Sequence, residues 1–128
     1  MSDTVTNGIR IKVVPNYELS HSNPSKNKFI YSYHVTILNE GVEESTLISR
    51  HWIITNSIGQ IEEVRGAGVV GETPTIYPGE SFEYTSFCPL NTEWGTMEGT
   101  YQMQKKDGTV FDAVIERFLL SRTGGIKN

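Results

Sequence analysis

The chain has 128 residues, of which 37% are hydrophobic and 20% charged, and its formal net charge is −4 at pH 7. This is the length of one ordinary domain with a sizeable core, so we predict a single domain over residues 1–128. The acidic balance, with no Lys/Arg run longer than Lys105-Lys106, argues against nucleic-acid binding, which requires a clustered basic face.

The cysteine content and the amino-terminal residues indicate the cellular compartment to expect for the protein. A single cysteine, Cys88, excludes an internal disulfide, which fits a reducing cytosol. The first ten residues are polar and carry no apolar signal-peptide region. No apolar run approaches the roughly 18 residues that a membrane-spanning helix requires. We therefore expect a cytoplasmic protein without membrane association.

The amino-terminal half predicts two strands separated by a polar loop. Residues 9–13 alternate between apolar and charged side chains, the period of a half-buried strand, and Pro15 either ends that strand or places it at a sheet edge. Residues 16–28 are polar and are expected to form an ordered loop. Residues 29–39 are the clearest strand, because aromatic and β-branched residues share one face: Phe29, Tyr31, Tyr33, Val35 and Ile37.

The next segment predicts a hairpin with strands at Leu47–Thr55 and Gln60–Arg65 and a tight turn at Asn56–Gly59. Both faces of the first strand are partly apolar, so we expect a central strand that is covered on both sides at one end. Trp52 is the natural core anchor. Arg50 would share its face and would need a partner.

The carboxy-terminal half predicts three more strands. Residues 80–87 alternate with Phe82 and Tyr84 inward, and residues 97–103 place Tyr101 where immunoglobulin-type sandwiches carry a corner tyrosine. In the last strand, residues 109–120, the apolar parity changes, which predicts a β-bulge near Glu116-Arg117. Residues 121–128 are expected to be a frayed tail.

Seven to eight short strands with no convincing helical pattern are typical of an all-β protein. The spacing of the strands and turns predicts an antiparallel β-sandwich.

A series of motifs occurs in one order along nearly the whole chain: Ser49-Arg50-His51-Trp52-Ile53-Ile54, Gly59, Val64-Arg65-Gly66-Ala67-Gly68-Val69-Val70-Gly71-Glu72-Thr73-Pro74, Pro78-Gly79-Glu80, Phe82-Glu83-Tyr84-Thr85-Ser86, Gly95, Met97, Gly99, Tyr101, Phe111, Ile115, Phe118 and Leu120. The combination resembles the ApaG family. Glu116 departs from it, because the family usually has a proline there.

The resemblance implies an immunoglobulin-like or fibronectin type III-like sandwich in a small bacterial protein. It also implies a genetic association with cobalt resistance and magnesium efflux, and with diadenosine-tetraphosphate metabolism through gene neighbourhood. Related domains in eukaryotic F-box and DNA-polymerase-interacting proteins look like interaction modules. No catalytic activity is implied.

The glycine loop spells the dinucleotide-binding fingerprint with Gly66, Gly68 and Gly71. That fingerprint functions only where a helix follows, and the prolines at positions 74 and 78 exclude a helix here. A weaker hypothesis is an anion-binding nest of backbone N–H groups in this loop, assisted by Arg65. In the alternative interpretation, the glycines supply positive φ or close packing at a bulged turn.

Other residues define candidate sites of a different kind. Arg50, His51 and Trp52, with Trp94, form a candidate recognition surface; the alternative is a core tryptophan, a paired arginine and a hydrogen-bonded histidine. Exposed Phe87, Trp94 and Ile76-Tyr77 would form a partner-binding patch if they cluster at one end of the sandwich, and otherwise they plug that end.

We expect neither a metal site nor a catalytic residue. The spacing of His21, His34 and His51 matches no metal-ligand pattern, and no acid or orienting residue accompanies Cys88. The sequence thus favours a non-enzymatic protein–protein interaction module without a cofactor. Its protein partner is unknown, and homodimerisation through a sheet edge is a further expectation. The alternative is a protein that binds phosphate, pyrophosphate or a nucleotide through Gly66–Gly71.

Overall fold

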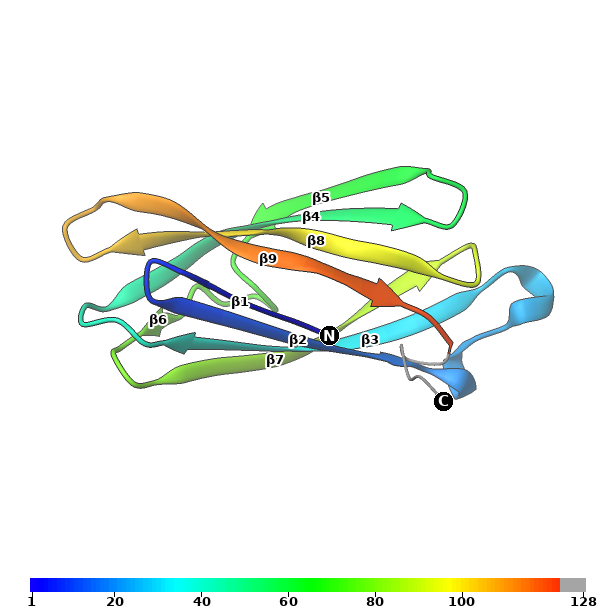
Figure 1. Ribbon diagram of the computed structural model, residues 1–128, viewed down its shortest axis with the longest axis horizontal. Helices are drawn as coiled ribbons and strands as arrows, with labels where there is room; N and C mark the ends of the chain where they lie inside the picture. Colours follow the sequence, from blue (N-terminus) through cyan, green and yellow to red (C-terminus); the bar gives the residue numbers. More distant parts are fainter. Residues whose placement is uncertain (123–128) are drawn as a thin grey trace.

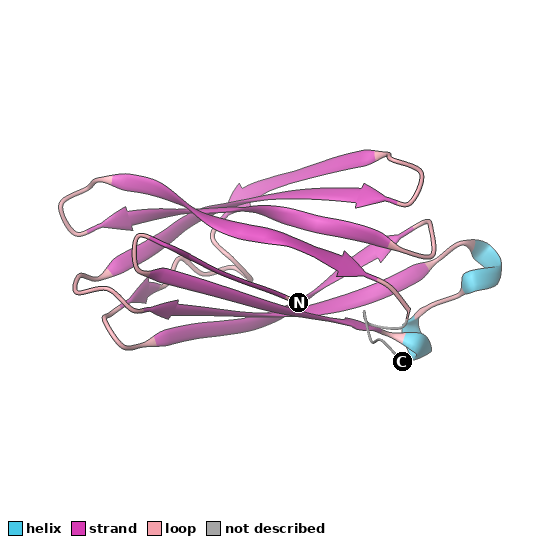
Figure 2. Cartoon of the chain, in the orientation of Figure 1, coloured by secondary structure: helices cyan, strands magenta, loops and turns pink. Residues whose placement is uncertain are grey.

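The computed structural model describes residues 1–122, which fold into two stacked antiparallel sheets (Figures 1 and 2). The described elements are nine strands and two short 3₁₀ turns: β1 (Ser2–Thr6), β2 (Ile9–Tyr17), η1 (Leu19–His21), η2 (Pro24–Lys26), β3 (Phe29–Asn39), β4 (Ser45–Asn56), β5 (Ile61–Ala67), β6 (Thr75–Ile76), β7 (Ser81–Leu90), β8 (Gly95–Lys105) and β9 (Val110–Leu120).

The strand order is β1-β2-β3-β7 in the first sheet and β5-β4-β8-β9 in the second, with β6 also paired to β4. The predicted all-β antiparallel sandwich is therefore confirmed. The predicted strand number is exceeded by β1 and by the two-residue β6. Strand β1 is polar and was missed, although Asn7 and Gly8 both have positive φ, as the two central residues of a type I′ hairpin turn require. From position 123 onward the predicted frayed tail lies outside the described residues.

Strand β3 forms as predicted, and its inward face supplies much of the core. Each of the five residues predicted on that face is at most 6% exposed. Proline 15 lies inside β2, which continues to Tyr17, while pairing with β1 stops at Val13. The proline therefore occupies a section of β2 whose other side has no strand partner in the described part of the chain, so no ladder donor is needed there.

Trp52 is the centre of an aromatic cluster that joins the two sheets. It is 2% exposed, and its indole lies 5.2 Å from the ring of Tyr33 on the facing sheet and 6.1 Å from that of Phe118. Next to this cluster the hydroxyls of Tyr84 and Tyr101 form a hydrogen bond between the sheets. The corner-tyrosine prediction is wrong, because Tyr101 bonds to the facing sheet and not to the backbone just upstream of it.

Two β-bulges explain the irregular apolar patterns. In β4, the pairing with β8 shifts between Leu47 and Ser49, so Leu47 and Trp52 both point into the core despite their opposite parity. Strand β4 is a central strand, as predicted, but the expectation that both of its faces are covered at one end is wrong. In β9, Glu116 and Arg117 together oppose Glu98, and Arg117 pairs with that carboxylate at 2.8 Å. The predicted bulge at this position is confirmed.

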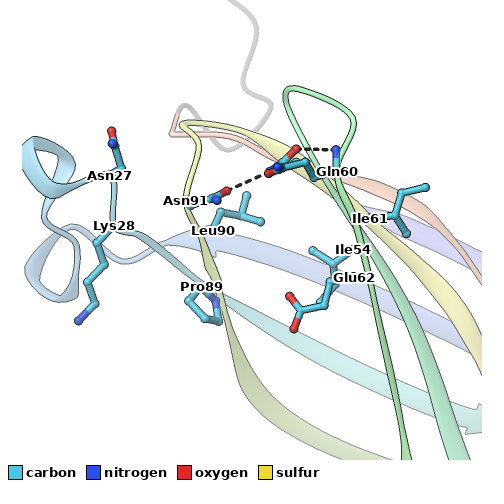
Figure 3. Close-up of a pocket in the computed structure, with 10 residues that line it drawn as sticks. Asn27, Lys28, Ile54, Gln60, Ile61, Glu62, Pro89, Leu90 and Asn91 are labelled. Atoms are coloured by element: carbon cyan, nitrogen blue, oxygen red, sulfur yellow. Dashed lines mark hydrogen bonds between the residues drawn. The ribbon is translucent and has the colours of Figure 1, made fainter.

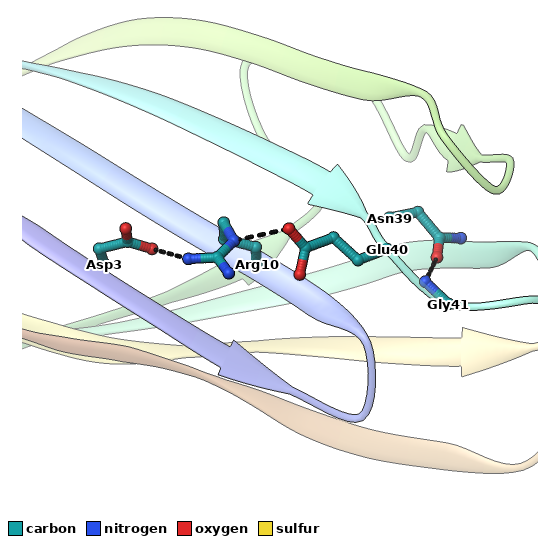
Figure 4. Close-up of polar contacts among 5 residues, drawn as sticks. All are labelled: Asp3, Arg10, Asn39, Glu40 and Gly41. Carbon is teal, nitrogen blue, oxygen red and sulfur yellow. Dashed lines mark hydrogen bonds and ion pairs between the residues drawn. The ribbon is translucent and has the colours of Figure 1, made fainter.

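The two long sides of the sandwich differ. On one side β1 lies against β9, and the edge N–H of Val114 donates to the Thr6 hydroxyl at 3.1 Å. Arg10 strengthens this side by bonding Asp3 at 2.9 Å and Glu40 at 2.8 Å (Figure 4). On the other side, β5 and β7 are both terminal strands of their sheets.

On the side where β1 lies against β9, the same substitution at two positions of β1 should have different effects on the free energy of unfolding. Thr6→Val should lower the free energy of unfolding by about 1 kcal/mol, because the Val114 N–H loses its acceptor. Thr4→Val should leave it unchanged or raise it by up to about 1 kcal/mol, because the buried Thr4 hydroxyl has no partner among the described residues. Urea denaturation measures both; equal effects would contradict the assigned role of Thr6.

Candidate functional site

A cleft runs along the open side of the sandwich between β5 and β7. It consists of two adjoining hollows of about 230 and 380 Å³ that share Ile54, Glu62 and Pro89. Figure 3 shows the larger hollow, with Pro89 on the strand that faces Ile54 and Glu62. The cleft is thus bounded by two strand edges, and within residues 1–122 each of these strands has a ladder partner only on its other side.

The floor of the smaller hollow is apolar and the rim is mixed. Trp52, Cys88 and Met97 line the floor and are at most 2% exposed. The rim includes Val64 from β5 and Phe87 from β7. Burial of apolar side chains behind an accessible rim is typical of sites that bind organic groups or polypeptide segments.

A polar cluster lines the outer end of the larger hollow. The Asn56 side-chain amide donates to the side-chain oxygens of Gln60 at 2.6 Å and of Asn91 at 3.0 Å (Figure 3). These bonds tie the β4–β5 turn to the loop after β7 and so fix the two walls of the cleft relative to each other.

Arg50 lies where the cleft meets the glycine loop. Its Nη1 donates to the carbonyl oxygens of Ala67 at 3.0 Å and of Gly68 at 2.9 Å. The guanidinium also lies flat against Gly66, the residue paired with it on β5, where any Cβ would come within 2.9 Å of its atoms. The predicted need of Arg50 for a partner is therefore met by backbone carbonyls of the loop.

The glycine segment forms a second, minimal hairpin. Val69 and Glu72 exchange backbone hydrogen bonds at 2.8 and 2.9 Å, and the two residues between them, Val70 and Gly71, both have positive φ. An added Cβ at Gly68 would overlap the carbonyl oxygen of Glu72. The segment is thus a tight turn with no helix after it, which agrees with the rejection of a dinucleotide-binding fold.

Three N–H groups of the glycine segment are already bonded. Gly68 donates to the Ile48 carbonyl of β4, Val69 and Glu72 donate to each other, and the Ala67 and Gly68 carbonyls accept from Arg50. Arg65 lies on the outer face of β5, where its side chain is 71% exposed and pairs with Glu63 at 3.4 Å. Phosphate binding by Arg65, Gly66, Gly68 and Gly71 stays a prediction, and the structure leaves it few free donors.

The candidate recognition residues lie on different surfaces. Arg50 and Trp52 point into the sandwich, whereas His51 points outward from β4 and bonds Glu63 at 2.8 Å. Trp94 lies in the loop between β7 and β8, is 47% exposed and lines a shallow hollow with Leu119. The structure therefore brings Arg50 and Trp52 together at the cleft. His51 lines a separate hollow with Arg50, Arg65 and Gly66, and Trp94 lies apart from all of them.

The other predicted apolar residues do not form one patch. Ile76 is buried, while Tyr77 and Phe87 are about half exposed. Tyr77 lies in the β6–β7 connection and Trp94 in the loop at the other end of β7.

The histidines of the described chain lie apart. His34 bonds Glu83 at 2.7 Å and Thr85 at 2.8 Å on the outer face of the first sheet, His51 lies on the second sheet, and His21 lies in η1. Within residues 1–122, no three His, Cys, Asp or Glu side chains are grouped as metal binding requires. In the same range, no helix is long and apolar enough to cross a bilayer.

Cys88 is shielded rather than activated. Burial raises the pKa of its thiol to about 12, and the nearby Glu62 carboxylate acts in the same direction. A nucleophilic cysteine needs the opposite shift. Cys88 is thus part of the cleft floor. Nothing in the sequence indicated that Cys88 lies close to β5.

The fold and the comparisons define the class of protein. A two-sheet antiparallel sandwich of this kind belongs to the immunoglobulin-like and fibronectin type III-like architectures. The ApaG domain model matches residues 19–105. The chain is 48% identical over 120 residues to Protein ApaG of Brucella anthropi, covering 94% of this chain and 92% of the relative. It is 47% identical over 126 residues to Protein ApaG of Anaeromyxobacter dehalogenans, covering 98% and 99%.

Solved structures of similar proteins have the same fold. An ApaA protein from Bordetella pertussis superposes with a TM-score of 0.87 at 46% identity, covering 88% of this chain and 92% of that one. The C-terminal domain of Wzt, at 12% identity and a TM-score of 0.56, shares the fold alone. The chain belongs to the ApaG family.

The two interpretations of the glycines predict different mutational effects. Gly71→Ala should lower the free energy of unfolding by about 1 kcal/mol, because open space surrounds it and only its positive φ is unfavourable. Gly68→Ala should cost about 3 kcal/mol, because its Cβ would also displace the Glu72 carbonyl. Thermal denaturation of the two variants measures the difference, and similar losses would contradict the packing role of Gly68.

Proposed function

We propose that this protein is a non-enzymatic protein-binding module and that the cleft between β5 and β7 is its binding site. The observation that carries the proposal is a cleft with an apolar floor and a mixed rim that lies between two strand edges, neither of which is paired within residues 1–122. Such a site suits an extended polypeptide segment, since main-chain hydrogen bonds to an edge strand supply affinity while side chains enter the cleft.

The composition of the two edges favours a different protein over a second copy. Strand β5 carries Glu62, Glu63 and Arg65, and β7 carries Pro89. Pairing between two copies of the β5 edge would bring like charges together, which destabilises a strand pair. Homodimerisation through these edges remains the alternative, and sedimentation distinguishes it by measuring the oligomeric state.

The chemistry of the cleft supports a role in binding. Among the described residues, its lining contains no histidine, and the Cys88 thiol holds its proton because burial raises its pKa to about 12. Glu62 therefore has no histidine and no ionised thiol in this lining with which to form a catalytic pair.

Site-specific crosslinking in cells tests the proposal. A photoreactive residue in place of Glu62, which lines both hollows, should capture a partner protein. The matched control is the same replacement at Glu116, an exposed carboxylate at the bulge of β9, and it should capture none. The same captured proteins from both positions, or none from either, would count against the proposal.

We propose in addition that the partner acts in the cytoplasm in divalent-cation homeostasis, the setting that the ApaG resemblance suggests. A strain that lacks the gene should show altered cobalt tolerance, measured as growth over a range of cobalt concentrations. Expression of the wild-type chain should restore it, and the Val64→Arg variant should not, because its side chain would fill the cleft. The outer-face variant Val114→Arg is the control and should restore it as well as wild type.

A further inference from the structure

Arg50 is a partly buried cation with spare hydrogen-bonding capacity. Nη1 is used by two backbone carbonyls. No side chain or backbone group of residues 1–122 is seen to accept a hydrogen bond from Nε or Nη2, and neither atom is sealed from solvent. The guanidinium is therefore held in place on one side and available on the other.

The charge of Arg50 has no counter-charge nearby. No carboxylate in residues 1–122 lies within ion-pair distance of it. The charge of Arg50 acts on the hydroxyls of Tyr33, Tyr84 and Tyr101. Burial raises the pKa of all three hydroxyls, so each remains neutral. A cation in a partly dry site is stabilised strongly by an anion that forms a hydrogen bond to it.

We propose that the cleft binds an extended segment of a partner protein that carries one carboxylate, and that this carboxylate pairs with Arg50. The inference rests on the proposed function and specifies the chemistry of its partner. A planar carboxylate matches the donor fork of a guanidinium, and a fixed guanidinium loses little side-chain freedom on binding.

The residues along the rest of the cleft indicate which side chains should follow this carboxylate in the bound segment. Along β4 and β5 the cross-strand pairs are Arg50 with Gly66, Trp52 with Val64, and Ile54 with Glu62. Apolar side chains therefore follow the cation, and Glu62 lies about 13 Å further along the strands at about 3.3 Å per residue. Because Glu62 would repel a second carboxylate there, the cleft selects one acidic residue at the Arg50 end with apolar residues after it.

Selection from a library of random peptides, displayed on phage against the full-length protein, tests this specificity. Selected peptides should share one acidic residue next to apolar ones. Replacement of that residue by its amide, Asp→Asn or Glu→Gln, should weaken binding to the wild-type protein by about tenfold or more, measured by fluorescence anisotropy. This measurement requires no change in the protein and so does not depend on the folding of a variant.

Protein variants then locate the effect. With Arg50→Gln, the acidic peptide and its amide should bind equally, whereas Arg117→Gln, at an exposed arginine of β9 that pairs with Glu98, should discriminate as wild type does. Peptides that bind in competition with each other but without an acidic preference would overturn the inference and leave the proposed function standing. Selection of no peptide would count against the proposed function itself. A second copy occupying the cleft, seen as self-association that the peptides do not reverse, would overturn the inference.

Discussion

The packing of Trp52 against rings from both sheets is the contact on which the rest of the molecule depends. One ring comes from β3, on the facing sheet, and two come from β8 and β9 within its own sheet. Aromatic side chains bury large areas and prefer tilted or edge-to-face contacts, so this cluster fixes both the spacing and the relative position of the sheets. The hydrogen bond between the hydroxyls of Tyr84 and Tyr101 satisfies the polar ends of the cluster inside the core.

Because this cluster lies close to the open side, the core and the cleft share residues. Trp52 and Met97 belong to the hydrophobic core and also form the cleft floor. The floor is therefore rigid, and a bound segment would meet a preformed surface, which lowers the entropic cost of association. The opposite side offers no such surface, since β1 covers the edge of β9.

The sequence predicted those features that depend on local pattern. The alternation in β3 identified its buried face, and the change of parity before Phe118 identified the bulge in β9, because each leaves a period-two signal. Strand β1 left no such signal, since its inward residues include Ser2 and Thr4, and its position depends on pairing with β2. The bulge in β4 was misinterpreted as coverage of both faces, because an extra residue and a two-sided apolar strand give the same sequence pattern.

The cleft could not be predicted for a different reason. Its walls come from β5 and β7, which belong to different sheets and are separated by the glycine hairpin and β6. Only the topology brings Glu62 and Cys88 to one side. Conversely, the residues adjacent in sequence at Arg50-His51-Trp52 were grouped as one surface, although the alternation of a strand must place His51 on the face opposite its two neighbours.

The glycine segment shows why a sequence motif needs its structural context. In a dinucleotide-binding fold the glycines allow backbone N–H groups to approach a phosphate. Here Gly66 makes room for the Arg50 guanidinium, and Gly68 permits a turn whose carbonyls hold that guanidinium. The same residue type at the same spacing thus orients a cation. An anion attracted to this region would meet that cation from the cleft, on the side opposite the carbonyls, and so the glycines and the cleft are parts of one site.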